Sequence, residues 1–183
     1  MKTKDITQMA LLIAIIIVLG MIPGIPLGFI PAPLILQNLG VMLAAILLMP
    51  KKTAITVGSF LLLALAGLPI LSGGRGGYAV FIGPTGGYLV GFFVAAVLTS
   101  ICLHQTRFQS LWYKAAIIWL FNVGLVNLLG IIWLVVQTNA PFSATFVSSL
   151  VFFPGDTIKA VIAVIVADRL QKYMRTTASV SQS

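Results

Sequence analysis

Long apolar runs, separated by short polar stretches, dominate this chain. Their lengths and breaks separate six of them: residues 6–21, 34–49, 53–71, 85–103, 112–136 and 147–170. Each has about 16–25 residues, close to the roughly 20 that a helix needs to cross a hydrocarbon core. None alternates with the period of two that is typical of a membrane β-barrel strand. The pattern therefore predicts an all-α integral membrane protein, a bundle of six transmembrane helices.

Composition favours a membrane protein over a soluble domain. Of the 183 residues, 60% are hydrophobic and 8% are charged, whereas a soluble domain carries about 25% charged residues. This excludes a soluble enzyme, and it excludes a nucleic-acid-binding module in spite of the net charge of +8. The single Cys102 excludes a disulfide framework, and the isolated His104 cannot form a metal site, so no metal or cofactor is expected.

The positions of the basic residues predict the orientation. With six crossings, nine of the eleven fall on one side, which the positive-inside rule assigns to the cytoplasm together with both termini. Arg75 alone lies on the other side, and Lys159 lies inside the last run. We expect a multi-pass protein of the bacterial cytoplasmic membrane, with one domain over residues 1–175 and a polar, disordered tail over residues 176–183. The nine are Lys2, Lys4, Lys51, Lys52, Arg107, Lys114, Arg169, Lys172 and Arg175.

Two predicted outer loops have unusual compositions. Residues 23–33 are apolar and contain four prolines, which indicates a loop buried against the bundle or a lid. Seven glycines occur among residues 73–87, and this stretch also contains Arg75. Glycine lets a backbone adopt positive φ and approach a ligand closely. The glycine-rich segment is either a flexible hairpin or a binding loop, and its aromatic residues and Arg75 favour the binding loop.

The last apolar run contains two charges, Asp156 and Lys159. They are three residues apart and so share one helix face. A charge at mid-bilayer costs about 2.5–3.5 kcal/mol on insertion scales, so both side chains should face the interior. They form either a mutual salt bridge or, as we favour, the contacts to two ends of a polar ligand. The preceding Pro154 and Gly155 predict a break in this helix.

Side-chain amides in other runs should lie level with these charges. Gln37, Asn38 and Asn127 fall in the predicted outer halves of their helices, at the depth of Asp156. Their convergence predicts a ligand pocket in the outer half of the bundle. Asn122 lies nearer the midplane, where an amide is more often a contact between helices.

Three motifs are more specific than the apolar pattern. The most specific is the run Gly83-Pro84-Thr85-Gly86-Gly87-Tyr88, preceded by Gly67-Leu68-Pro69. Two others are Pro33-x-x-x-Gln37-x-Leu39-Gly40 and Pro154-Gly155-Asp156-x-x-Lys159. With these motifs the chain resembles, over about residues 6–170, the BioY family, the biotin-binding S-components of energy-coupling factor (ECF) transporters.

The resemblance implies a protein that is not an enzyme. Such a protein captures biotin from outside and delivers it by docking to a transmembrane coupling protein and a pair of cytoplasmic ATPases. Ala10 and Ala14, one turn apart in the first helix, match the small-residue motif through which S-components contact the coupling protein. The candidate ligand-binding residues are Asp156, Lys159, Asn127, Gln37, Arg75, Tyr88, Thr85 and Gly83.

The chemistry of biotin fits these residues. Asp156 and Asn127 are expected to contact its ureido group. Tyr88 and apolar residues of the first outer loop are expected to pack against its rings. Either Lys159 or Arg75 is expected to pair with its carboxylate. Two other functions stay open. One is a stand-alone, ion-coupled secondary vitamin carrier with Asp156 as the coupling group. The other is a structural membrane subunit whose Asp156–Lys159 pair is only a salt bridge.

Overall fold

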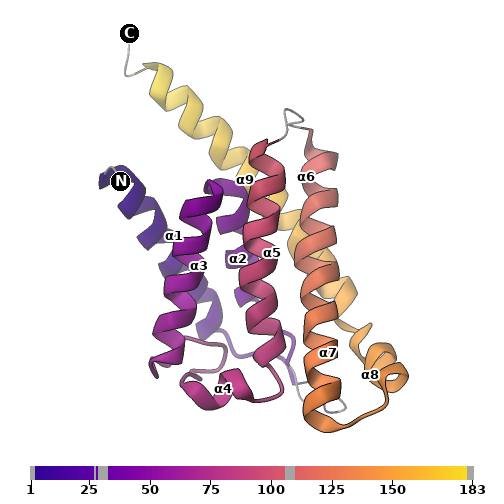
Figure 1. Cartoon of the computed structure of the whole chain (residues 1–183). Helices are drawn as coiled ribbons and strands as arrows, with labels where there is room; N and C mark the ends of the chain where they lie inside the picture. Colours follow the sequence, from indigo (N-terminus) through magenta and orange to yellow (C-terminus); the bar gives the residue numbers. More distant parts are fainter. Residues whose placement is uncertain (1–2, 27, 29–32, 106–109, 181–183) are drawn as a thin grey trace.

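A computed structural model describes residues 3–26, 28, 33–105 and 110–180. Within these ranges the regular structure is helical, with two isolated β-bridges and no strand, which confirms the all-α prediction (Figure 1). The helices are α1 (Thr3–Met21), α2 (Gln37–Leu47), α3 (Pro50–Leu65), α4 (Tyr78–Ile82), α5 (Gly86–Gln105), α6 (Leu111–Ile118), the π-helix η1 (Trp119–Leu125), α7 (Val126–Thr138), α8 (Phe142–Ser149) and α9 (Phe152–Val180).

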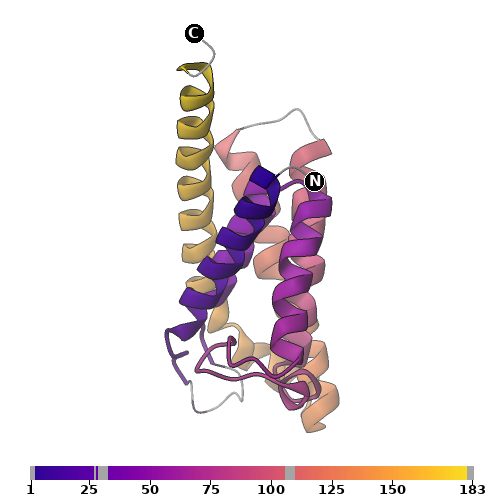
Figure 2. The same cartoon turned by 90° about the vertical axis from the view of Figure 1, so that its left-hand side faces the viewer.

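The helices form one elongated bundle around α2. Nine of the eleven residues of α2 are buried, and α2 packs against α1, α3, α5 and α9. The segment formed by α6, η1 and α7 is continuous and lies beside α5 (Figure 1). α1 begins and α9 ends at one end of the bundle, whereas α4 and α8 lie at the other end (Figures 1 and 2). The central position of α2 explains why its amides face protein and not the surroundings.

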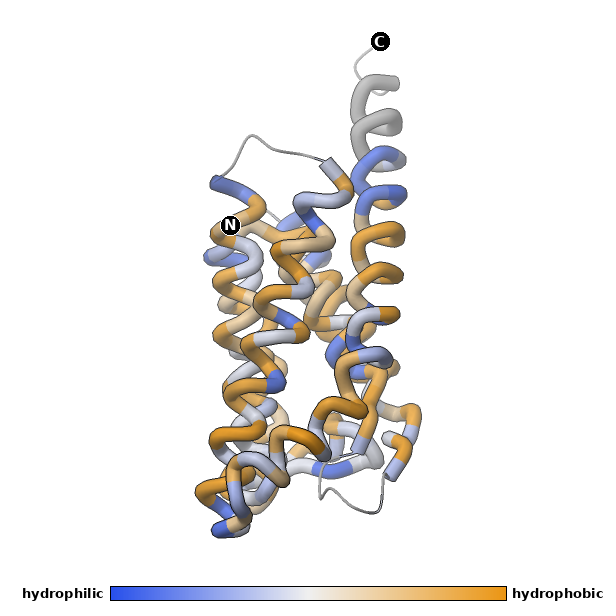
Figure 3. The backbone as a smooth tube through the Cα atoms, turned by 90° about the vertical axis from the view of Figure 1, so that its right-hand side faces the viewer, coloured by the Kyte–Doolittle hydropathy of each residue, from blue (hydrophilic) through white to orange (hydrophobic). Residues whose placement is uncertain are grey.

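The outer surface is apolar, as expected of a membrane protein. Large hydrophobic side chains such as Leu11, Leu62 and Val136 are exposed, and hydrophobic residues cover most of the helices (Figure 3). By length and composition, three described segments could cross a membrane: α1, α5 and residues Leu111–Thr138. The α8–α9 pair, bent by 45°, could form a fourth span. Helices also cover the other two predicted runs, but α2 and α3 are shorter. Six crossings and cytoplasmic termini therefore stay predictions.

The last predicted helix is broken at a different place than expected. The break separates α8 from α9 at residues 150–151, before Pro154 and Gly155, so the predicted position was wrong. Pro154 lies in the first turn of α9. Backbone N–H groups in the first turn have no acceptor within the helix, so a proline, which lacks this group, costs no helical hydrogen bond there. Proline is therefore compatible with a helix start here and does not interrupt the helix.

The last helix extends into the predicted tail. α9 continues to Val180, and the disorder of residues 176–183 stays a prediction. Extending an existing helix needs no new nucleus, which is the costly step of helix formation. The rest of the predicted tail lies outside the described residues.

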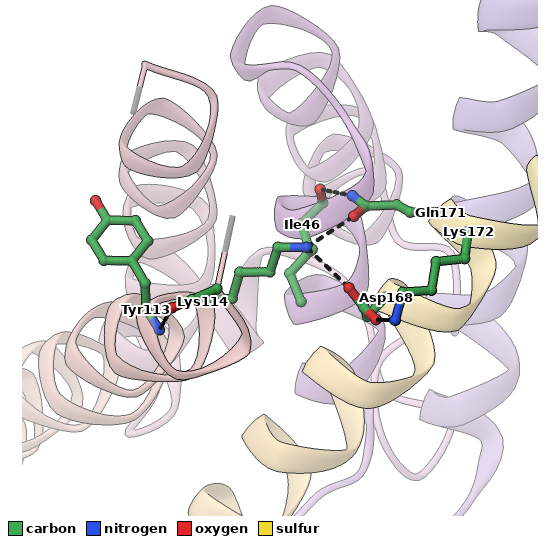
Figure 4. Close-up of polar contacts among 7 residues, drawn as sticks. Ile46, Tyr113, Lys114, Asp168, Gln171 and Lys172 are labelled. Atoms are coloured by element: carbon green, nitrogen blue, oxygen red, sulfur yellow. Dashed lines mark hydrogen bonds and ion pairs between the residues drawn. The ribbon is translucent and has the colours of Figure 1, made fainter. Parts of the chain in front are cut away.

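Lys114 is buried, although its position at the start of an apolar run suggested a charge in a loop. Its ammonium group lies 3.3 Å from Asp168 Oδ1 and donates to Gln171 Oε1 at 3.1 Å, both on α9 (Figure 4). Gln171 Nε2 in turn donates to the carbonyl of Ile46 on α2 at 3.2 Å. We call Lys114, Asp168, Gln171 and the Ile46 carbonyl the α6–α9–α2 network. It joins three helices toward the end of the bundle where α1 begins.

Close packing of α5 against the α6–η1–α7 segment places the side chains of the site. A Cβ at Gly87 would overlap Trp133 and lie 2.7 Å from the carbonyl of Leu129, so only glycine permits this contact. Asn122 Nδ2 donates to Thr99 Oγ1 at 2.7 Å, which confirms its predicted role as a contact between helices. This packing fixes α7, and with it Asn127, beside α5.

Candidate ligand-binding site

A cavity lies among α2, α5, α7, α9 and the segment of residues 71–75. Apolar side chains and a set of polar and charged groups both line it, a combination that is typical of small-molecule sites. Seven of the eight predicted ligand-binding residues line it, and Gly83 does not. The lining residues are Pro33, Leu34, Ile35, Gln37, Asn38, Leu71, Ser72, Arg75, Val80, Thr85, Tyr88, Leu89, Phe92, Val126, Asn127, Phe152, Asp156 and Lys159.

Asp156 is the centre of a buried polar cluster. Its Oδ1 accepts from Asn38 Nδ2 at 2.9 Å and lies 2.5 Å from Lys159 Nζ, and its Oδ2 accepts from Asn127 Nδ2 at 3.1 Å. All four side chains are buried. The predicted convergence of amides and charges from three helices is therefore confirmed for α2, α7 and α9. Among the described residues, no group of three or more His, Cys, Asp or Glu is placed to hold a metal ion.

Lys159 pairs with Asp156, so the two charges do not separate toward opposite ends of the cavity as we favoured. The ammonium group also donates to the carbonyl of Ile35 at 2.7 Å and to Asn38 Oδ1 at 3.1 Å. A lysine ammonium has three N–H donors. These three partners match all of them, so the positive charge is compensated and hydrogen-bonded within the protein.

Asn127 presents an unused acceptor. Its Nδ2 donates to the carbonyl of Val123 at 2.9 Å and to Asp156 Oδ2. Its Oδ1 is buried and has no hydrogen-bond partner among the described residues. Leaving a buried acceptor unpaired costs about 1–3 kcal/mol. An N–H donor of a ligand in the cavity would remove this cost.

Aromatic and aliphatic side chains form the remaining walls. The rings of Tyr88 and Phe152 meet edge to face, with centroids 6.1 Å apart. Tyr88 reaches this position because α7 has Gly130 opposite it, where a Cβ would overlap the Tyr88 ring. Leu89, Phe92 and Val126 add apolar surface. This half of the cavity suits an apolar ring or an alkyl chain.

Arg75 lies at the rim, on a tight turn. Leu71 N donates to the Arg75 carbonyl at 2.9 Å, and Arg75 N donates to the Leu71 carbonyl at 3.2 Å. Gly73 and Gly74 take φ values of 75° and 70°, which side chains disfavour. Arg75 Nε donates to the Ser72 carbonyl at 3.1 Å. The glycine-rich segment thus forms a turn that holds an exposed guanidinium beside the cavity.

Two residues of the most specific motif support the backbone. Thr85 Oγ1 donates to the Val80 carbonyl at 3.4 Å, and the Thr85 carbonyl accepts from the amides at the start of α5. The Gly83 carbonyl accepts from Trp133 Nε1 at 2.8 Å. Gly83 therefore contacts α7, which explains why it does not line the cavity.

The structure adds residues that the sequence prediction had not placed in the site. Asn38 lies at the predicted depth but is not among the predicted ligand-binding residues, and it bonds both Asp156 and Lys159. Its position next to Gln37 in an apolar run was the available signal. Ser72 and Phe152 line the cavity through the fold alone, since serine and phenylalanine in such segments carry no specific signal.

Ala10 and Ala14 lie away from the cavity, on an exposed face of α1. Leu11 and Val18 are exposed nearby, with 60% and 59% of their surface accessible. The start of α1 is joined to α3 by an ion pair between Asp5 and Lys52 at 2.6 Å. α1 therefore offers a small-residue surface on a helix fixed to the bundle.

Comparisons with known proteins agree over nearly the whole chain. A family model described as the BioY family matches residues 1–176. The chain is 47% identical over 174 residues to the biotin transporter BioY of Lactococcus lactis subsp. cremoris (strain MG1363), covering 93% of this chain and 92% of that protein. It is 43% identical over 169 residues to the biotin transporter BioY of Rhizobium etli, covering 89% and 90%.

A solved structure agrees as well. The crystal structure of the S-component for biotin from an ECF-type ABC transporter matches with a TM-score of 0.90 and 46% identity, covering 94% of this chain and 95% of that one. The named relatives are transporters, and this chain is not an enzyme. Matches of this extent in sequence and in structure lead to one conclusion: the chain is a membrane protein of the BioY family.

Proposed function

We propose that this chain binds biotin in the cavity around Asp156 and serves as the substrate-binding S-component of an ECF-type uptake transporter. It does so as a multi-pass protein of the bacterial cytoplasmic membrane, with the cavity in the outer half. The observation that carries the proposal is a small-molecule cavity with a buried carboxylate and an unused amide acceptor. Relatives that are 47% and 43% identical are named biotin transporters.

The ureido ring of biotin carries two N–H donors and needs two acceptors near each other. Asp156 Oδ2 and Asn127 Oδ1 are such a pair. They lie near each other because Nδ2 of the same Asn127 amide donates to Asp156 Oδ2. An ionised carboxylate has about four lone-pair sites, so Oδ2 can accept from a ligand in addition to Asn127. The apolar walls at Tyr88, Phe92 and Val126 suit the thiophane ring and the alkyl chain.

Arg75 is the better candidate for the biotin carboxylate. Lys159 was the alternative, but its three N–H donors are matched by Asp156, Asn38 and the Ile35 carbonyl. The Arg75 guanidinium has five donors, of which Nε contacts Ser72, and it lies exposed at the rim of the cavity. This arrangement would bury the ureido group and leave the charged tail at the rim.

Delivery into the cell would need partners. The sequence contains no Gly-x4-Gly-Lys-[Ser/Thr] motif, so the chain itself does not hydrolyse ATP through a P-loop. We propose that a pair of cytoplasmic ATPases supplies the energy and that this chain docks to a transmembrane coupling protein. The exposed Ala10 and Ala14 support docking on α1, since small residues let helix backbones approach closely in a bilayer. Within the described part of the chain, no specific contact favours the alternative, a stand-alone ion-coupled vitamin carrier.

An uptake assay tests whether biotin uptake needs the coupling protein and the ATPases. The chain is produced, alone or with a coupling protein and ATPases, in cells that lack their own biotin uptake. Accumulation of radiolabelled biotin should need all the partners and should stop when the ATPases carry an inactive P-loop. Equal accumulation by the chain alone, abolished by an ionophore, would contradict the proposal and support the ion-coupled carrier.

A further inference from the structure

We propose that Gln37 is a positioning residue, which holds the turn of residues 71–75 so that Arg75 is already placed for the ligand carboxylate. This inference rests on the proposed function, because it gives Gln37 a role in recognition of the charged tail of biotin. It replaces the expectation that Gln37 contacts the ligand directly.

Gln37 directs its polar atoms at the backbone. It is the first residue of α2 and 1% exposed. Its Nε2 donates to the carbonyls of Ile16 at 3.2 Å and Ile70 at 2.7 Å, and its Oε1 accepts from Ser72 N at 3.2 Å. One amide thus links α2, α1 and the two ends of the segment that enters the turn.

The same bonds lead to Arg75. Ser72 N donates to Gln37, and the Ser72 carbonyl accepts from Arg75 Nε. Gly73 N donates to the Gly20 carbonyl at 3.3 Å, which adds a second contact between the turn and α1. A single residue, Ser72, therefore separates the Gln37 amide from the guanidinium.

Gly20 provides the room for this amide. A Cβ at Gly20 would overlap Gln37 Nε2 and lie 2.7 Å from Gln37 Cδ and 2.9 Å from the Ile70 carbonyl. An alanine at this position would displace the amide from its partners without changing Gln37 itself. Gly58 is a matched control, because its nearest contact is Phe93 Cε2 at an ordinary 3.4 Å.

Contacts that hold the turn of residues 71–75 before the ligand binds are important because its glycines allow many backbone conformations. Gly73 and Gly74 adopt positive φ, and glycine loses more conformational freedom on ordering than any other residue. Arginine also loses rotamer freedom when it is fixed. A turn that is already held in the free protein avoids both costs on binding, which is the principle of preorganisation. Losing the Gln37 contacts should therefore weaken only interactions that depend on Arg75.

The test compares biotin with biotin methyl ester, whose tail carries no charge. Equilibrium binding is measured for the purified wild type, Arg75→Ala, Gln37→Met and the double variant. Arg75→Ala should weaken biotin by roughly 10- to 100-fold, as expected for charge-assisted hydrogen bonds, and the ester far less. Gln37→Met should follow the same pattern, and the double variant should bind biotin no worse than Arg75→Ala, because the two residues act through one contact.

Gly20→Ala provides a second route if Gln37→Met does not elute as a monodisperse protein. It should reproduce the selective loss of biotin, whereas Gly58→Ala should match the wild type. Equal losses for both ligands, independent losses in the double variant, or unaltered binding by Gly20→Ala would each overturn the positioning role. Wild-type protein that binds neither ligand would instead refute the proposed function itself, and the inference with it.

Discussion

The Lys159 side chain is held entirely by contacts within the protein. Its ammonium group lies between Asp156, Asn38 and the carbonyl of Ile35. It thereby pairs with the buried carboxylate of Asp156, since an unpaired buried charge is very costly. We assign it to the support of Asp156.

Replacing Lys159 by alanine should therefore weaken biotin and biotin methyl ester by similar factors. The variant leaves Asp156 without its compensating charge, and breaking a buried pair in this way costs about 3–5 kcal/mol of stability. Equilibrium binding of both ligands and thermal unfolding in detergent measure these effects, with the exposed Lys51→Ala as the control. An ester affinity that is preserved while biotin binding falls would show that Lys159 is the carboxylate anchor.

Some residues of the site could be predicted from the sequence because their burial is costly. Asp156, Lys159 and Asn127 stand in apolar runs, and a polar group there must face the interior and find partners. Lys114 gave no such signal, because a lysine at the end of a run is also typical of a charge at the membrane surface. Its partner Asp168 lies 54 residues away along the chain, and only the folded structure brings them together.

The helices could be predicted better than their ends. The apolar runs predicted where the long helices lie. The ends were harder to predict, because Pro154 and Gly155 are compatible with both a helix break and a helix start, and the start is observed. The short α4 within the glycine-rich segment was not predicted, since it has five residues and no periodic pattern. The π-helical turns of η1 likewise have no sequence signature that distinguishes them from α-helix.

The exposed small-residue face of α1 leads to a prediction at the scale of an element. Replacing Ala14 by phenylalanine adds bulk outside the cavity, so biotin binding to the purified protein should match the wild type. Uptake in cells that contain the coupling protein and ATPases should be lost, because close helix approach is blocked. Leu11→Phe, a change at an already bulky exposed position, is the control. Loss of binding by Ala14→Phe would make this face part of the internal packing.

On the scale of the whole molecule, the α6–α9–α2 network and the cavity lie in different parts of the bundle. Figure 4 shows the contacts of the α6–α9–α2 network. None of its side chains lines the cavity. The network joins helices toward the end where α1 begins, whereas the cavity extends to the turn of residues 71–75. Substitutions in the network should therefore alter the melting temperature of the protein more than its dissociation constant for biotin.

Lys114→Met tests this separation. Loss of the buried ammonium removes hydrogen bonds to Asp168 and Gln171, worth about 1.5–3 kcal/mol for a charged donor. Lys172→Met is a matched control, because Lys172 bonds the same Asp168 at 2.9 Å but is 72% exposed, and an exposed pair contributes about 0–1 kcal/mol. We expect a lower melting temperature for Lys114→Met only, with wild-type biotin affinity for both. A large loss of affinity in Lys114→Met would show that the network controls the cavity.

Biotin binding in the cavity around Asp156 is tested most directly by equilibrium binding of biotin to the purified, detergent-solubilised protein and to its Asp156→Ala variant. We expect saturable binding by the wild type at one site per chain, and a loss of affinity of at least about 100-fold in the variant, in the range measured for buried charged partners. No binding by folded wild-type protein, or the same affinity for the variant, would contradict the assignment of biotin to this cavity.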